Sequence, residues 1–231
     1  MSGKPGKGNP NGRRKYTLDH EFFSEGSLLS CYWAGFIAAD GCIVRTNGQN
    51  SVKIKLSQKD SGHLEQFLQD AGSNSPVKSS TDGYCYICVG SRQWMSDLEA
   101  LGITPRKTLT LEPPVGLSRE QSLAFIAGLI DGDGCISFDH YTYGGPDSPI
   151  TEYPTIDLCG TEPVMVWVKD FMDKNIPASV QAGVGRYKSG LSRWKASGNR
   201  ALRIKEQLKD LDLPLMSRKW DRIEFAKRAV S

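Results

Sequence analysis

A stretch of eleven residues occurs twice in the chain, and this repeat constrains the fold more than any other feature of the sequence. The first copy is WAGFIAADGCI at residues 33–43, and the second is IAGLIDGDGCI at residues 126–136. Equivalent positions are separated by 133 − 40 = 93 residues. Each copy is typical of an apolar helix that stops on Asp-Gly, and we expect Gly41 and Gly134 at the left-handed position where many helices end.

Small residues lie four positions apart in each copy, at 35 and 39 in the first and at 128 and 132 in the second. This spacing places them on one face of each helix, where the absence of large side chains lets two helix backbones approach closely. The natural partner of each copy is the other copy. The repeat therefore predicts two helices packed side by side, with their Asp-Gly ends together.

Asp40 and Asp133 would then share one end of the helix pair. The C-terminal end of a helix carries partial negative charge, so a carboxylate there loses a few tenths to about 1 kcal/mol, and two nearby carboxylates repel each other. A bound divalent cation reverses the sign of both effects. Carboxylate oxygens suit Mg²⁺, which keeps several waters and completes its shell with substrate phosphates. The alternative is two ordinary surface aspartates, each before a glycine that ends a helix.

Both copies resemble the LAGLIDADG motif, and two copies in one chain resemble the monomeric LAGLIDADG homing endonucleases. The second copy departs from the nine-letter motif at its first and seventh letters, and the first copy departs at Trp33, Phe36 and Ala38. Ala38 replaces the first aspartate of the motif, which is not a metal ligand in the family. The resemblance implies a magnesium-dependent DNA endonuclease, a phosphodiester hydrolase that cuts both strands of a long asymmetric target in intron homing.

The resemblance also implies the cofactor and the partners. Asp40 and Asp133 are the predicted metal ligands, together with Ala39 and Gly132, and Mn²⁺ or Ca²⁺ is expected to substitute for Mg²⁺ in binding. Double-stranded DNA is the expected partner. We expect a monomer that requires no protein partner, with the RNA of a host intron as an open possibility.

The family places a basic residue near each cleavage site, and two dibasic segments fit this pattern. Arg-Lys occurs at 106–107 and again at 218–219, with an offset of 219 − 107 = 112. Lys107 and Lys219 are therefore predicted to orient water or to steady phosphate charge, and the alternative is an ordinary surface pair. Gln58 and Lys59 match a further family feature that the second half lacks, so Gln58 is a predicted catalytic residue. This difference predicts that one strand is nicked faster than the other.

Composition and charge distribution narrow the class of protein. The chain has 231 residues with an apolar share of 39%, which is typical of globular proteins, and no apolar run approaches the roughly 18 residues of a membrane span. Six cysteines without a secretory leader favour an intracellular protein with reduced thiols, without distinguishing cytoplasm, phage-infected cell or organelle. Residues 1–15 carry five basic residues and no acid, so the remainder has 29 − 5 = 24 basic against 26 acidic residues. Positive charge for binding DNA must therefore be segregated on one face.

Hydrophobic periodicity predicts an α-β-β-α-β-β-α unit in each half. We expect an α+β fold in which a pseudo-twofold pair of repeats forms two antiparallel sheets, a DNA-binding saddle around the paired motif helices. The expected divisions are a basic flexible tail (1–15), the first repeat (16–107), a linker (108–117) and the second repeat (118–231). The predicted helices cover 28–39, 60–71, 91–101, 118–132, 162–174, 199–211 and a last helix from 217. The predicted strands are 42–46, 51–57, 76–80, 84–89, 135–139 and 155–159, with a long polar loop at 140–152 and a hairpin at about 178–196.

Polar residues alternate with apolar ones along these strands, and the polar face of a sheet can enter the DNA major groove. Each such position can instead be a solvated strand residue, but the pattern recurs on four hairpins. The predicted DNA contacts of the first half are Arg45, Asn47, Gln49, Asn50, Lys53, Lys55, Lys78, Ser80, Tyr84, Tyr86 and Arg92. Those of the second half are Tyr141, Tyr143, Thr155, Asp157, Gln181, Arg186, Lys188, Arg193 and Lys195.

Two other functions compete with cleavage. One is an RNA-binding maturase that assists intron splicing, and the other is a DNA-binding protein on the same scaffold that has lost cleavage. The presence of both aspartates and both lysines argues against a cleavage-dead scaffold. The lone Cys85-x-x-Cys88 pair does not indicate zinc, because strand alternation directs the two sulfurs to opposite faces and no second pair has zinc spacing.

Overall fold

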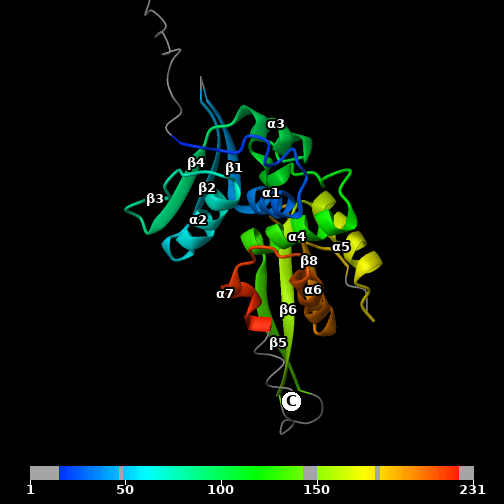
Figure 1. Cartoon of the computed structure of the whole chain (residues 1–231). Coiled ribbons are helices and arrows are strands. Elements are labelled where there is room, and N and C mark those ends of the chain that lie inside the picture. The colour runs from blue at the N-terminus through cyan, green and yellow to red at the C-terminus, as the bar shows by residue number, and fades with distance from the viewer. Residues whose placement is uncertain (1–15, 47–48, 143–149, 180–182, 224–231) are drawn as a thin grey trace, which may run out of the picture.

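The computed structural model describes residues 16–46, 49–142, 150–179 and 183–223. The predicted α+β fold is confirmed in this part of the chain, with two four-stranded antiparallel sheets and the predicted order of elements in each half. Figure 1 shows the two sheets with α1 and α4 between them. The helices are α1 (Leu28–Asp40), α2 (Ser61–Asp70), α3 (Arg92–Ala100), α4 (Arg119–Asp133), α5 (Glu162–Asn175), α6 (Asn199–Lys209) and α7 (Ser217–Trp220), with short 3-10 helices η1 (Gln58–Asp60) and η2 (Lys107–Leu109).

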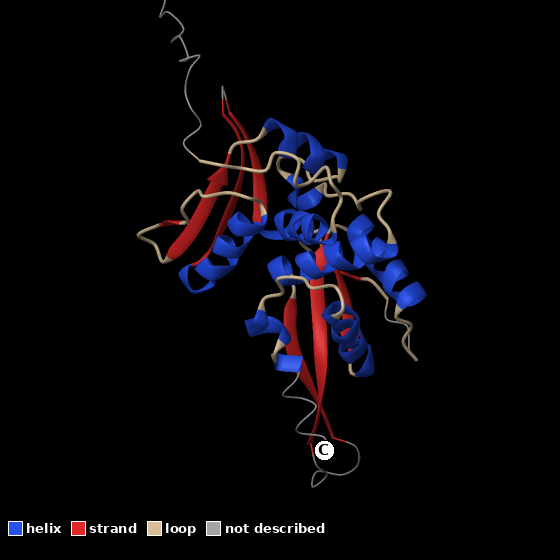
Figure 2. Cartoon of the chain, in the orientation of Figure 1, coloured by secondary structure: helices blue, strands red, loops and turns tan. Residues whose placement is uncertain are grey.

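The two sheets have the same topology. The first has the order β1-β2-β4-β3 and the second the order β5-β6-β8-β7, so both are built from two hairpins joined by a helix. Figure 2 shows these strands as two separate groups with helices between them. The strands are β1 (Gly41–Thr46), β2 (Gln49–Ser57), β3 (Lys78–Ser79), β4 (Tyr84–Val89), β5 (Cys135–Thr142), β6 (Ile150–Gly160), β7 (Gly185–Arg186) and β8 (Ser192–Ser197).

Both motif helices begin at a serine cap. The side chain of Ser27 accepts a hydrogen bond from the backbone N–H of Ser30 at the start of α1. At the start of α4, Ser118 and Gln121 form a reciprocal capping box, which a serine followed three residues later by glutamine favours. These caps satisfy backbone donors that a helix cannot satisfy by itself, and they fix where each motif helix starts.

The two motif helices pack backbone to backbone, as the small residues predict. A Cβ atom on Gly35 would lie 2.0 Å from the carbonyl oxygen of Phe125, and one on Gly128 would lie 2.0 Å from that of Tyr32. At the other end of the contact, a Cβ atom on Gly132 would lie 2.3 Å from the Cβ of Ala39. Real Cβ atoms do not approach this closely, so only glycine permits the observed spacing at these positions. The packing buries both helices in one apolar cluster that extends into both sheets.

The β5–β6 hairpin is longer than the sequence predicts. Residues 140–142 and 150–152, which the prediction assigns to a loop, continue the ladder through the pairs His140–Glu152, Tyr141–Thr151 and Thr142–Ile150. All of these residues except Ile150 are polar. In Figure 1 no helix of the described residues lies over this end of the ribbon, so polar side chains are accommodated there. The rings of Tyr141 and Tyr153 meet edge to face at a centroid distance of 5.8 Å and support it.

No helix in the described ranges is long and apolar enough to cross a membrane. The domain boundaries at 16, 108 and 118 stay a prediction.

Candidate active site and nucleic-acid interface

Asp40 and Asp133 are the last residues of α1 and α4, and both side chains are exposed. The prediction of a left-handed glycine after each aspartate was wrong, because Gly41 and Gly134 have φ values of −91° and −78° in extended conformation. Their need for glycine is steric. A Cβ atom would lie 2.9 Å from the Ile37 carbonyl oxygen at Gly41 and 2.5 Å from that of Ile130 at Gly134. Each helix therefore turns directly into a strand beside its own last turn.

The two carboxylates interact electrostatically. The surrounding protein displaces part of the hydrating water of Asp40, which raises its pKa, and the negative charge of Asp133 raises this pKa further. Loss of hydration also raises the pKa of Asp133, although Lys107 and Lys219 oppose this change. The pair is therefore a site where ionised carboxylates are held at an electrostatic cost that a divalent cation would offset.

The lysines predicted beside the aspartates are buried, each with 8% of its surface exposed. The Nζ of Lys219 donates to the carbonyls of Ile130, Asp131, Gly132 and Gly134 at 2.7–3.1 Å, and so caps the C-terminal end of α4. The Nζ of Lys107 donates to the Gly41 carbonyl at 2.5 Å at the end of α1. Burial lowers the pKa of both lysines, and the nearby aspartates counteract this effect. Each lysine thus lies within the electrostatic field of the carboxylates, but it is anchored on backbone oxygens.

A buried carboxylate that the sequence analysis did not assign supports this arrangement. Asp131 is 1% exposed and accepts hydrogen bonds from the Tyr32 hydroxyl at 2.8 Å, the Met216 N–H at 3.0 Å and Trp220 Nε1 at 2.8 Å. Burial raises the pKa of Asp131 to about 6, and its hydrogen bonds oppose the rise. Asp131 ties α4 to α1 and to α7, the helix that carries Lys219. The position of Asp131 inside the second motif copy is the sequence feature that could have identified it. Ala38, at the equivalent position of the first copy, cannot form such a network.

Asp60 joins the two halves of the molecule. It occupies the cap position before α2, but its side chain makes no capping hydrogen bond. Both of its carboxylate oxygens instead accept from Arg218, at 2.6 Å from Nε and 3.0 Å from Nη2.

Gln58, the predicted catalytic glutamine, is exposed at the start of η1, and its backbone N–H donates to the Gly83 carbonyl.

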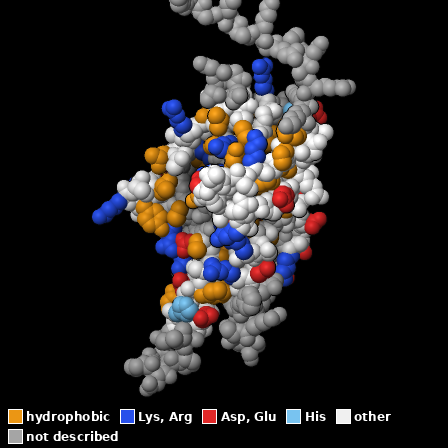
Figure 3. Space-filling view, turned by 90° about the vertical axis from the view of Figure 1, so that its left-hand side faces the viewer, with side chains coloured by type: hydrophobic (Ala, Val, Ile, Leu, Met, Phe, Trp, Pro, Cys, Tyr) orange, Lys and Arg blue, Asp and Glu red, His pale blue; other side chains and the backbone are white. Residues whose placement is uncertain are grey.

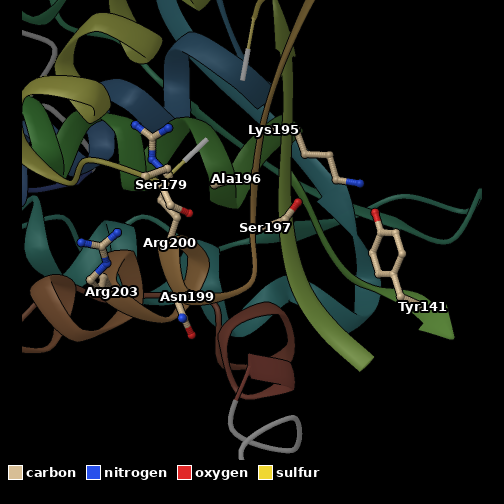
Figure 4. A pocket seen from close by; sticks show the side chains of 9 residues that line it. Tyr141, Ser179, Lys195, Ala196, Ser197, Asn199, Arg200 and Arg203 are labelled. Carbon is tan, nitrogen blue, oxygen red and sulfur yellow. The ribbon is translucent and has the colours of Figure 1, made fainter. Parts of the chain in front are cut away.

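Two cavities bear on the position of the site. A cavity of about 100 Å³ is bordered by Asp133, Lys107 and Ala39 together with apolar residues of the second half. A larger cavity of about 470 Å³ lies at the end of β8, and Figure 4 shows Tyr141 and Lys195 on one side of it and Arg200 and Arg203 on the other. No motif residue borders the larger cavity. Of these two cavities, the smaller one is therefore next to a candidate catalytic carboxylate, that of Asp133.

The residues present fit a divalent cation that shares its shell with a substrate. Within the described ranges, no group of three His, Cys, Asp or Glu side chains is placed to hold a metal by itself. Asp40 and Asp133 supply two carboxylates, so water and phosphate oxygens would have to complete the shell, as is usual for Mg²⁺. Ala39 and Gly132, which directly precede the two aspartates, approach each other closely, and the Gly132 carbonyl already accepts from Lys219.

The outward face of the first sheet carries lysines among tyrosine rings. Lys53 Nζ lies 5.3 Å and Lys78 Nζ 5.9 Å from the centroid of the Tyr86 ring, and Lys55 Nζ lies 4.2 Å from that of Tyr84. The pairs Lys53–Cys88, Lys55–Tyr86 and Lys78–Tyr86 in the ladder place these residues on one face. In Figure 3, Lys and Arg side chains lie among side chains of the hydrophobic group, which includes tyrosine, on the face that is turned toward the viewer. Such a surface suits a nucleic-acid backbone and exposed bases.

The outward face of the second sheet carries cations that are paired with acids. Arg193 forms a bidentate pair with Asp157, and Lys195 bonds to Asp139 at 2.5 Å. Thr155 lies on the same face but is fully buried, with its hydroxyl 2.8 Å from that of Ser137. Its prediction as a contact residue therefore needs correction, because the side chain supports this face from within.

Three predicted contacts lie on the wrong face of their sheet. Arg45 bonds to Glu99 of α3, and Asn50 is its partner in the ladder, so both share the face of the buried strand residues. Arg186 pairs with Glu162 of α5 and lies opposite the buried Ser192. Counting alternate residues from the buried Ile43 would have placed Arg45 correctly.

The other predicted contacts fall into three groups. Tyr141 is exposed on the outward face. Arg92 is exposed at the start of α3, and Lys188 is exposed in the turn after β7. Ser80 is half-buried in the corresponding turn between β3 and β4. Gln49 belongs to β2 through its backbone. Asn47, Tyr143 and Gln181 lie outside the described residues.

Comparison with solved structures finds the same architecture in LAGLIDADG proteins. The chain is similar to the LAGLIDADG meganuclease I-AabMI bound to uncleaved DNA, with a TM-score of 0.58 and 14% identity over 86% of this chain and 88% of the other. It is also similar to the I-LtrWI homing endonuclease bound to target DNA, with a TM-score of 0.58 and 11% identity over 91% and 90% of the two chains. I-SmaMI bound to an uncleaved DNA target in the presence of calcium ions matches with a TM-score of 0.59 and 12% identity over 87% and 90%.

These similarities define the class of fold. The chain has the fold of the two-motif LAGLIDADG homing endonucleases, as the repeated motif predicts. No protein-family model matches the chain. A stretch of 112 residues, 46% of this chain, is 24% identical to part of the probable phosphoenolpyruvate synthase of Methanocaldococcus jannaschii, but the match covers only 9% of that protein. The chain thus spans about a tenth of that relative's length, and the relative's name implies nothing about the activity of this chain.

Proposed function

We propose that this protein is a site-specific endonuclease that hydrolyses both strands of a long asymmetric DNA target with Mg²⁺. One observation carries the proposal: Asp40 and Asp133 end two helices that pack backbone to backbone, and each carboxylate lies close enough to feel the charge of the other half. Two carboxylates at a pseudo-twofold axis provide one for each strand of a duplex. The structural neighbours I-AabMI, I-LtrWI and I-SmaMI are bound to DNA in their structures, which supports the same kind of partner here.

The residues of this chain have separate tasks in the proposed reaction. Asp40 and Asp133, with Ala39 and Gly132 beside them, would hold the metal, and bound Mg²⁺ supplies Lewis-acid stabilisation and activation of water. Lys107 and Lys219 keep positive charge next to the carboxylates and fix the helix ends from which these side chains project. The exposed side chain of Gln58 is available to order water. The lysines and tyrosines of the first sheet would hold the DNA backbone.

Cleavage of a random DNA library tests the proposal. The protein is incubated with the library and Mg²⁺, the cut ends are sequenced, and the recovered site is then cloned into a plasmid. We expect a single long site and linear plasmid product, with no cutting in EDTA. Double-strand cutting by the variant in which both Asp40 and Asp133 are asparagine would overturn the proposed site.

Two other results would favour the competing functions. A selected site that is bound but never cut, under any divalent cation tested, would indicate a cleavage-dead DNA-binding protein. Tight binding to a structured intron RNA, with no selection from the DNA library, would indicate a maturase. Labelling each strand of the plasmid separately measures the order of nicking, and equal rates for both strands would contradict the predicted difference between the halves.

A further inference from the structure

The pair formed by Arg193 and Asp157 stands out on the outward face of the second sheet. Nε and Nη2 of Arg193 donate to Oδ1 and Oδ2 of Asp157, so the carboxylate holds the guanidinium through two parallel hydrogen bonds. The side chain of Asp157 is 18% exposed, whereas that of Arg193 is 40% exposed. The acid is therefore largely covered, and the guanidinium reaches the surface.

The strand register explains why the pair is held firmly. Cys159 faces Arg193 and Asp157 faces Lys195 across the β6–β8 ladder, so Arg193 reaches diagonally to a carboxylate on the neighbouring strand, which is within the range of a long side chain. Lys195, the direct neighbour of Asp157, turns instead to Asp139 on β5. Each cation has its own acid, so Arg193 and Lys195 do not compete for Asp157.

The guanidinium keeps a second donor edge when one edge is occupied. Arginine presents five N–H donors in a rigid planar fork. Asp157 accepts from Nε and from one N–H of Nη2. The remaining N–H of Nη2 and those of Nη1 lie on the edge that points away from the carboxylate, and two of them are parallel and coplanar. Arg193 therefore offers a preoriented pair of donors with little rotamer freedom left to lose.

Two parallel donors match one base in the major groove. Guanine presents the acceptors O6 and N7 side by side, adenine presents an acceptor beside a donor, cytosine presents a donor, and thymine presents one acceptor and a methyl group. We propose that Arg193, held by Asp157, reads the guanine of one G·C base pair in the half of the target that lies against the second sheet. This inference rests on the proposed function, because it requires that the outward face contacts DNA.

The same molecule contains a matched control. Arg186 donates through Nε and Nη2 to Glu162 in the same bidentate way, but it lies on the helix side of the same hairpin. The lysines of the first sheet provide a second contrast, because an ammonium group is a point charge without a bidentate edge. Position on the outward face together with the bidentate fork thus distinguishes Arg193 from Arg186 and from these lysines.

The experiment is a binding selection with the full-length protein and a random duplex library in Ca²⁺. The bound DNA is sequenced for the wild type and for Arg193→Ala, Arg193→Lys, Asp157→Asn and Arg186→Ala. We expect one strongly preferred G·C position in the wild-type site. Arg193→Ala should reduce the preference there by about 10- to 100-fold and leave the other positions unchanged. Arg193→Lys, which keeps the charge, should lose it as well, whereas Arg186→Ala should retain it.

Asp157→Asn tests the holding role by itself. Asparagine cannot accept two hydrogen bonds through two oxygens, so Arg193 should become free to contact phosphates. Affinity for unrelated DNA should therefore rise while the guanine preference falls.

The outcomes separate the two proposals. A wild-type site whose guanine preferences all survive in Arg193→Ala and Arg193→Lys would overturn the role of Arg193 and leave the endonuclease proposal intact. Failure of the wild type to select any DNA would overturn both proposals. An equal loss of the guanine preference in Arg186→Ala would also contradict the inference, since that side chain lies on the other face.

Discussion

Gly128→Ala is the sharpest test of how the two halves meet. The new Cβ atom would lie 2.0 Å from the carbonyl oxygen of Tyr32, whereas ordinary contact requires about 3.5 Å, so the helices must separate by about 1.5 Å. Alanine gains about 1 kcal/mol in helix propensity. Overpacking costs about 1–3 kcal/mol where side chains can yield, and here a backbone oxygen blocks the space. We expect a net loss of about 2 kcal/mol or more, which lowers Tm by about 4–8 °C for a chain of this size.

Two assays distinguish this effect from general damage. Thermal unfolding of Gly128→Ala should be compared with that of Gly62→Ala, because Gly62 lies in α2 and a Cβ atom added to it would have no atom within 4 Å. The control should be neutral or gain up to about 1 kcal/mol. Plasmid cleavage at a temperature where both variants are folded should fall about 100-fold in Gly128→Ala, since a shift of about 1 Å in catalytic groups has this effect. A Gly128→Ala protein as stable and active as the control would refute the close backbone packing.

Three further predictions concern the site and its surroundings. Asp40→Asn and Asp133→Asn should each abolish double-strand cutting, while DNA binding measured by gel shift persists. Without metal, the free energy of unfolding of each variant in urea should rise by a few tenths to about 1 kcal/mol, because a negative charge is removed from a helix C-terminus. Lys219→Met should lose about 2–3 kcal/mol by the same assay because the carbonyls of Asp131, Gly132 and Gly134 lose this donor, whereas that of Ile130 still accepts from the Gly134 N–H. Lys107→Met should lose less because one carbonyl is affected. Burial lowers the pKa of His63 to about 4, so the folded state binds fewer protons than the unfolded state between pH 4 and the ordinary value of 6.5. Stability should therefore rise by about 3 kcal/mol across this range, and His63→Phe should flatten that part of the pH profile.

Local patterns in the sequence predicted most of the fold. The capping box at Ser118 and Gln121 fixed the start of α4, and the alternation of Val52 and Ile54 with lysines fixed the faces of β2. Small residues in the repeated motif predicted the contact between α1 and α4, because close helix packing requires them at a fixed spacing. These features depend on neighbours within about ten residues, so a single sequence contains them.

Partners that are distant in sequence could not be predicted in the same way. Arg218 pairs with Asp60, which is 158 residues away in the sequence, and Asp131 bonds to Tyr32, which is 99 residues away. The ammonium groups of Lys107 and Lys219 bond to backbone carbonyl oxygens. Because every residue has a carbonyl, the residue types in the sequence do not show which carbonyls these lysines bind. The candidate site is therefore more tightly supported than the motif indicates, because the sequence predicts its two carboxylates but only the fold reveals the residues that support them.

The links between the halves have a consequence for protein engineering. Val115 in the connection between the repeats is 78% exposed, whereas Tyr32 of the first half bonds to Asp131 and to the Pro214 carbonyl of the second. Arg218 and Asp60 form a second bridge between the halves. Cutting the backbone near Val115 would leave all of these bonds in place, so two separately expressed pieces should reassemble into the folded molecule, and this assembly can be placed under external control.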